Sequence, residues 1–204
     1  MKPKLRLGYH GLNLTLRPEH ITTERTARMK TISEKGIEYA ISLFSENVSD
    51  LKKIMKWNAK QGVKLYRISS NLAPHITNIF LMPKSKIRNW KNLLYEIPEE
   101  VQDRLAEIGS IAVRSGIRLT FHPGLHVTLS STKPGVVNRA KRDIYYHKLL
   151  LDFLYRDSKF QPENFPVIIL HGGGAGLDKS ESSSRWIQEY LSIPKETRKY
   201  LVIE

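Results

Sequence analysis

Cysteine is absent from this chain of 204 residues. Disulfide bonds, thiolate zinc sites and cysteine nucleophiles are therefore excluded. A bound metal ion would have to take its ligands from histidine, aspartate, glutamate or water. The chemistry of any metal centre is thus restricted to nitrogen and oxygen donors.

Long hydrophobic runs are also missing. No stretch approaches the roughly 18 to 20 uncharged apolar residues of a membrane span, although 40% of the residues are hydrophobic. The first ten residues, MKPKLRLGYH, are basic but lack the apolar core of a secretion signal. We therefore expect no membrane partner, a cytoplasmic, nucleoid-associated location, and a single domain over residues 1–204.

Acidic residues are scarce relative to basic ones. The chain has 33 Lys and Arg against 20 Asp and Glu, which gives a formal net charge of +13. This excess favours a partner with many negative charges, and nucleic acid is the first candidate. A basic enzyme with a small anionic substrate is the alternative, and no obligate protein partner is evident from the sequence.

Hydrophobic periodicity predicts strands and helices in alternation along the chain. Strands are expected at residues 5–9, 63–69, 117–122, 166–171 and 200–204. Helices are expected at residues 22–45, weakened at Gly36, and at residues 50–61, 98–115, 138–155 and 182–191. Residues 73–90 are expected to form a long loop or a short helical segment.

Five strands that alternate with helices favour a parallel α/β architecture. A TIM-type (β/α)8 barrel and a doubly wound sheet are the two candidates. Polar residues follow nearly every predicted strand, as in a barrel, whereas an open sheet concentrates them at one switch point. A complete barrel usually needs about 250 residues. We therefore expect the N-terminal portion of a TIM barrel, with about its first five strands.

Three histidines and one glutamate come after predicted strands. They are His75, His122, His171 and Glu204. Because the carboxyl ends of barrel strands meet at one rim, we expect these side chains to converge. Neutral imidazole and carboxylate groups are ligands of Zn²⁺, Mn²⁺ and Fe²⁺. The pattern therefore indicates a metal site.

Four motifs resemble those of a known family. They are RLGYxxxNLTLR at residues 6–17, DLxxIMxWNxxxGVxLYRISSxLxPH at 50–75, LTFHPGxxVxLSS at 119–131 and VIILHGGGAGxDK at 167–179. Together they resemble ultraviolet-damage endonuclease, also called UV dimer endonuclease, which belongs to the xylose-isomerase-like barrels. The resemblance covers essentially the whole chain. It also implies that the family barrel continues beyond the position of Glu204 and supplies further metal ligands there.

The resemblance implies a DNA repair enzyme. Such an endonuclease would nick double-stranded DNA immediately 5′ of cyclobutane pyrimidine dimers and 6-4 photoproducts by metal-assisted phosphodiester hydrolysis. The expected cofactor is a cluster of divalent ions, foremost Mn²⁺, with Zn²⁺ or Mg²⁺ as alternatives. His122, His171 and Glu204 would be catalytic, and they would bind metal together with His75.

Four further residues match family positions that contact the lesion. Tyr9 and Asn13 would stack on a base and hydrogen-bond a base edge; a core tyrosine and a turn asparagine are the alternative reading. Leu125 and His126 stand where the family usually has Gln and Tyr, which probe the duplex. A leucine can still wedge between bases and a histidine can still stack, and loop packing is the alternative for both.

Two other functions remain compatible with the sequence. A metal-dependent sugar isomerase or epimerase would use the same type of barrel and similar ligands, but it would need no excess of positive charge. A non-catalytic form that binds damaged DNA would retain the basic surface without a complete metal site. Basic residues in two segments, 84–91 and 133–142, are candidates for phosphate contacts.

Overall fold

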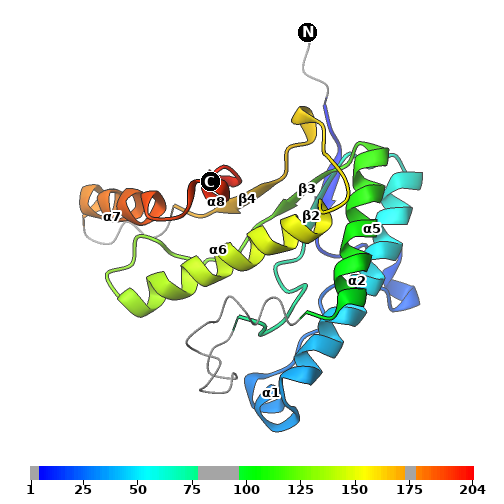
Figure 1. The fold of residues 1–204 in the computed structure, drawn as a ribbon, viewed down its shortest axis with the longest axis horizontal. Helices are drawn as coiled ribbons and strands as arrows, with labels where there is room; N and C mark the ends of the chain where they lie inside the picture. The colour runs from blue at the N-terminus through cyan, green and yellow to red at the C-terminus, as the bar shows by residue number, and fades with distance from the viewer. Residues whose placement is uncertain (1–4, 78–96, 173–177) are drawn as a thin grey trace.

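A parallel β-sheet forms the centre of the molecule (Figure 1). The computed structural model describes residues 5–77, 97–172 and 178–204. Within these ranges the strands are β1 (Gly8–His10), β2 (Leu65–Ile68), β3 (Arg118–Phe121), β4 (Val167–Leu170) and β5 (Leu201–Ile203). They lie side by side in the order β1-β2-β3-β4-β5, and every neighbouring pair is parallel.

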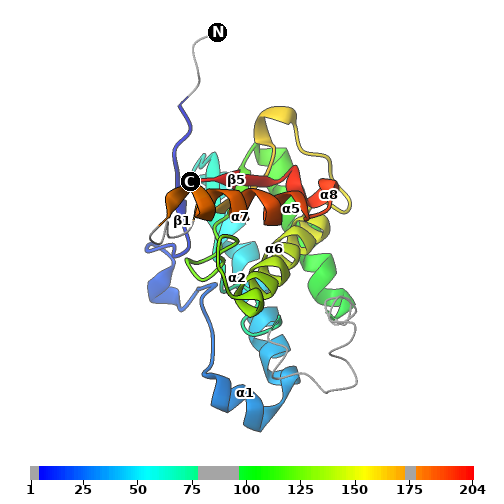
Figure 2. The same ribbon diagram turned by 90° about the vertical axis from the view of Figure 1, so that its left-hand side faces the viewer.

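Helices connect the strands. The described α-helices are α1 (Met29–Lys35), α2 (Ile37–Lys60), α5 (Glu99–Ser115), α6 (Pro134–Leu154), α7 (Lys179–Leu191) and α8 (Lys195–Arg198). Two short 3-10 helices, η1 (Arg17–Glu19) and η4 (Pro162–Asn164), complete the described set. Helix α5 packs between α2 and α6 along the sheet (Figures 1 and 2). None of the helices described is long and apolar enough to cross a membrane.

The strand order decides between the two α/β architectures. Crossovers between parallel strands are right-handed in nearly all proteins, so a strand order that never reverses keeps the connecting helices on one face. A doubly wound sheet would reverse its order and place helices on both faces. The uninterrupted order seen here is that of a partial β/α barrel, so the α/β prediction is confirmed.

Alternating side chains give the sheet two different faces. One face packs on the helices through fully buried residues, namely Tyr66, Ile68, Leu119, Phe121, Ile168 and Leu170. The other face carries Arg67, Thr120, Ile169 and Val202, and we call it the open face. Val202 is 41% exposed there. Residues that continue the open face beyond the strand ends lie at the carboxyl edge of the sheet, where barrel active sites lie.

The region of residues 22–61 differs from the prediction. Residues 22–28 are not helical; α1 begins at Met29 and ends at Lys35, and the C-cap Gly36 has a φ of 87°. Helix α2 then runs unbroken through residues 46–49, which were predicted to separate two helices. The polar side chain of Asn47 accepts a hydrogen bond from the Arg25 backbone N–H and donates to the carbonyls of Arg25 and Leu72. In the sequence the polar residues of this turn resemble a loop. In the folded chain Asn47 is instead bonded to segments distant in the sequence.

The other predicted elements agree with the structure to within about one turn. Helix α5 matches its prediction closely, and α6 and α7 each begin a few residues early. The Asp178 carboxylate caps α7 by accepting from the Glu181 N–H. The short helix α8 was not predicted. Most of the segment predicted as a loop at residues 73–90, and the basic segment at 84–91, lie outside the described residues.

Candidate metal site at the strand ends

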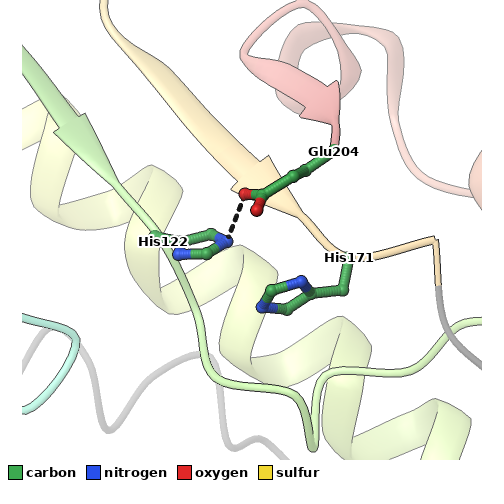
Figure 3. A group of neighbouring side chains, drawn as sticks. All are labelled: His122, His171 and Glu204. Carbon is green, nitrogen blue, oxygen red and sulfur yellow. Dashed lines mark ion pairs between the residues drawn. The ribbon is translucent and has the colours of Figure 1, made fainter.

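Three side chains meet where β3, β4 and β5 end (Figure 3). His122, His171 and Glu204 each offer one possible ligand atom, and these atoms all lie within 4.8 Å of one another. The rings of His122 and His171 are 4.4 Å apart between centroids. Nε2 of His122 lies 3.0 Å from Oε2 of Glu204. The predicted convergence of these three residues is therefore present.

Sheet register explains why these residues meet. Leu170 pairs with Ile203, so the next residues, His171 and Glu204, lie opposite each other. The Glu204 backbone N–H extends this ladder by donating to the Leu170 carbonyl at 2.9 Å. His122 follows Phe121, which pairs with Ile168. All three side chains thus continue the open face at its carboxyl edge, where barrel active sites lie.

The electrostatic environment favours the neutral form of His122. Burial lowers the pKa of His122, and the charges of Arg67 and His171 lower it further, while Glu204 opposes the shift. A lower pKa favours the neutral imidazole, which is the form that ligates metals. The Glu204 side chain is 56% exposed, whereas that of His122 is 17% exposed.

The donor set fits a divalent transition ion. Nε2 of His122 is buried and lacks a hydrogen-bond partner, even though Glu204 is only 3.0 Å away. The two atoms face each other at ion-pair distance without hydrogen-bond alignment. Two imidazoles and one carboxylate match Mn²⁺, Zn²⁺ or Fe²⁺. His122, His171 and Glu204 are the residues that would hold such an ion.

Arg67 lies next to the site, and no sequence motif identified it as a site residue. Its Nη1 donates to Nδ1 of His122 at 3.1 Å. Arg67 pairs with Thr120 across β2 and β3, so it lies diagonally beside His122 on the open face. The available signal was strand alternation: Tyr66 and Ile68 are apolar and bracket Arg67, which places the arginine on the opposite face.

His75 lies apart from the three-residue group. Strand β2 ends at Ile68. His75 therefore does not lie directly after a strand, contrary to the prediction. It adopts a left-handed conformation with φ of 59°, and its Nε2 lies 2.7 Å from the Ala27 carbonyl. Its side chain lines a separate cavity of about 450 Å³ together with His126 and Arg142. Metal binding by His75 stays a prediction, without support from the cluster geometry.

Tyr9 and Asn13 are bound to each other. Tyr9 pairs with Tyr66 across β1 and β2 and donates from its hydroxyl to Oδ1 of Asn58 in α2 at 2.6 Å. Nδ2 of Asn13 donates to the Tyr9 hydroxyl at 2.8 Å, and Oδ1 accepts from two backbone N–H groups of the following turn. These are the contacts of a core tyrosine and a turn asparagine, and lesion contact by either residue stays a prediction.

Leu125 and His126 lie in the loop that follows His122. Leu125 is 76% exposed, as are Leu5 and Leu14 to a similar extent. Nε2 of His126 lies 3.1 Å from Oδ2 of Asp143 in α6. This hydrogen bond raises the pKa of His126, although burial opposes the shift. The loop thus presents an apolar tip beside an anchored imidazole, and DNA contact by Leu125 and His126 stays a prediction.

Comparison with known proteins places these features in a family. The family model described as UV-endonuclease UvdE matches residues 5–204. The UV-damage endonuclease of Schizosaccharomyces pombe is 32% identical over 98% of this chain and 31% of its own length. The UV DNA damage endonuclease of Clostridium perfringens is 29% identical over 98% of this chain and 43% of its own length. This chain therefore spans less than half the length of these two relatives.

A solved structure gives the same result at the level of the fold. The crystal structure of SacUVDE superposes with a TM-score of 0.78 and 28% sequence identity, over 98% of this chain and 60% of that one. The family match thus extends from the sequence motifs to the three-dimensional arrangement of strands and helices. The chain belongs to the UV-endonuclease UvdE family.

Proposed function

We propose that this chain acts in DNA repair as a metal-dependent endonuclease that cuts DNA at ultraviolet lesions. The observation that carries the proposal is the convergence of His122, His171 and Glu204 at the strand ends of a UvdE-family fold. The finer features, a cut immediately 5′ of pyrimidine dimers and 6-4 photoproducts and a preference for Mn²⁺, rest on the family resemblance.

The three candidate ligand residues would hold a divalent metal ion and fix its position. A bound divalent ion would supply Lewis-acid activation of water and neutralisation of phosphate charge. His122 and His171 come from neighbouring strands of one sheet, which holds their rings in a fixed relative position. Glu204 would add a carboxylate ligand, since its Oε2 lies 3.0 Å from Nε2 of His122.

Affinity for DNA would come from the positive charge. The net charge of +13 supports contacts with the phosphate backbone. Selectivity would come from the loop after β3, where the exposed Leu125 would enter a base step and His126 would stack beside it. Damaged bases stack poorly, so their extrusion from the duplex requires less energy than that of normal bases. Tyr9 and Asn13 would contact the extruded lesion.

The test compares irradiated and unirradiated supercoiled plasmid in the presence of Mn²⁺. We expect the chain to nick irradiated plasmid selectively and to lose this activity after chelation. His122→Ala should reduce nicking by more than about 100-fold, because even loss of an outer-shell partner of a metal ligand costs about 10–100-fold. His20→Asn is the matched control: His20 is exposed, and asparagine tolerates its left-handed backbone.

A non-catalytic role is the second candidate. The chain covers 60% of the SacUVDE chain, and the described residues provide a group of three metal ligands. Selective binding of irradiated DNA without nicking would favour a binding module and contradict the nuclease proposal. Absence of any binding to duplex DNA in a gel shift would contradict both and favour a barrel enzyme that acts on small molecules.

A further inference from the structure

Arg67 has an unusual environment for a partly buried arginine. Its guanidinium donates to a ring nitrogen of His122 at 3.1 Å. No carboxylate in the described parts of the chain lies within 4.0 Å of it. A guanidinium always carries its charge and normally pairs with an anion when it is shielded from water. Within the described ranges, the hydrogen bond to His122 is therefore not accompanied by an ion pair to Arg67.

The hydrogen bond from Arg67 determines the tautomer of His122. Guanidinium groups donate and never accept, so Nδ1 must accept and cannot carry a proton. The ring proton of neutral His122 is then on Nε2, the nitrogen that faces Glu204. A metal ligand nitrogen must be unprotonated. Coordination through Nε2 therefore requires the proton on Nδ1, where it would point at Arg67.

Arg67 and a metal ion thus require different tautomers of the His122 ring. When the ring remains neutral, one proton leaves Nε2 for solvent and one is taken up at Nδ1, with no net change. The N–H on Nδ1 and the N–H groups of Arg67 are both donors, so their hydrogen bond is lost. The guanidinium would then be released beside the metal site, within a few ångströms of His122.

We propose that Arg67 competes with the metal ion for His122 and, once released, binds a phosphate group at the metal site. This inference rests on the proposed function, because the phosphate would be that of the DNA backbone. The planar donor fork of arginine matches two oxygens of a phosphate, and the charge is already at the site. Metal binding and phosphate binding are therefore coupled: each favours the other by releasing or capturing Arg67.

The first experiment measures metal and phosphate binding separately from catalysis. Isothermal titration with Mn²⁺ alone compares the wild-type chain with Arg67→Met, which removes the donors but keeps similar side-chain length. We expect Arg67→Met to bind Mn²⁺ about tenfold or more tightly, because the competing charged hydrogen bond is gone. With Mn²⁺ saturating, its affinity for inorganic phosphate should fall about tenfold. Arg67→Lys keeps the charge and should show intermediate values for both.

A second experiment needs no variant. Long-range proton–nitrogen NMR spectra of the wild-type chain should show His122 protonated on Nε2 in the presence of chelator. Addition of Zn²⁺, a diamagnetic probe, should move the proton to Nδ1. A ring that carries its proton on Nδ1 before Zn²⁺ is added would overturn the inference, whatever the variants do.

The outcomes separate this inference from the proposed function. If Mn²⁺ binds but Arg67→Met binds it with equal or lower affinity, Arg67 does not compete and the inference is wrong, whereas the nuclease proposal stands. If the binding changes occur as expected but irradiated plasmid is not cut, the nuclease proposal is wrong and the coupling stands. If neither Mn²⁺ nor Zn²⁺ binds the wild-type chain, both are wrong.

Discussion

At the scale of single residues, environment gives the histidines different roles. His122 lies beside an arginine and a carboxylate at the strand ends, and His126 pairs with Asp143 on the surface. His147 is buried in α6 between the rings of Phe121 and Tyr146. Residue type alone does not distinguish a ligand from a core residue, because burial and neighbouring charges set the protonation state.

His147 makes stability depend on pH. Burial lowers its pKa to about 4, despite a hydrogen bond with the Asp143 carbonyl. In the unfolded chain the pKa returns to about 6.5, so the unfolded state binds the proton more readily at pH values between about 4 and 6.5. The stability due to neutral His147 is therefore complete above this range and is lost as the pH falls through it.

We expect the free energy of unfolding to fall by up to roughly 3 kcal/mol from this residue between pH 7 and pH 4. Urea unfolding in the presence of chelator, followed by circular dichroism, measures this change. His147→Gln keeps a side-chain donor and removes the titration, so its stability should decline less over the same pH range. An equal decline in both proteins would show that His147 does not titrate as described.

At the scale of elements, α5 and α6 approach each other closely at Gly109. A Cβ atom at this position would lie 1.5 Å from the Leu154 carbonyl oxygen, which is backbone and cannot rotate away. Ala106 and Ala112 are also buried on this side of α5. Small residues therefore permit the helix contact that positions α6, the helix that precedes β4, against the sheet.

Gly109→Ala should destabilise the protein by about 3 kcal/mol or more, at or above the upper end of typical overpacking effects. Gly135→Ala is the matched control, because Gly135 is also helical and nothing lies within 4 Å of its added Cβ. The control should be neutral or stabilising by about 0.5–1 kcal/mol. Thermal and urea unfolding of both variants test the contact, and similar stability of the two would contradict it.

At the scale of the whole molecule, charge should govern DNA binding more than any single contact. Thirty-three basic side chains, counted over the full chain, exceed the acidic ones by 13. Each phosphate that they neutralise releases counterions, so affinity falls steeply with salt. The preference for irradiated DNA depends instead on the energy of base extrusion and should change little with salt.

Fluorescence anisotropy with irradiated and unirradiated duplexes tests whether charge sets the affinity and base extrusion sets the preference. Between 50 and 200 mM salt we expect the affinity for both duplexes to fall at least about tenfold. The ratio of the two affinities should stay constant within a factor of about 2–3, the usual scatter for such contributions. A salt-independent affinity would mean that phosphate contacts are not the source of binding.

Much of the architecture followed from local patterns. In the sequence, Leu119 and Phe121 alternate with Arg118 and Thr120, whereas residues 167–170 form a continuous apolar run typical of a buried parallel strand. The helical turn at residues 46–49 could not be located from the sequence, because Asn47 and Asp50 make their bonds with segments distant in the sequence. Asp50 pairs with Arg25, a contact that no local pattern contains.

The amino-acid sequence by itself determined the parallel α/β class and the family, and it named four candidate metal ligands, three of which converge in the structure. It could do so because strand alternation and strand-end motifs are local properties of the chain. Tertiary structure decided which polar residues meet. Parallel register brought His171 opposite Glu204 and Arg67 beside His122, whereas His75 turned toward Ala27. Such contacts depend on distances between strands and loops, which only the folded chain defines.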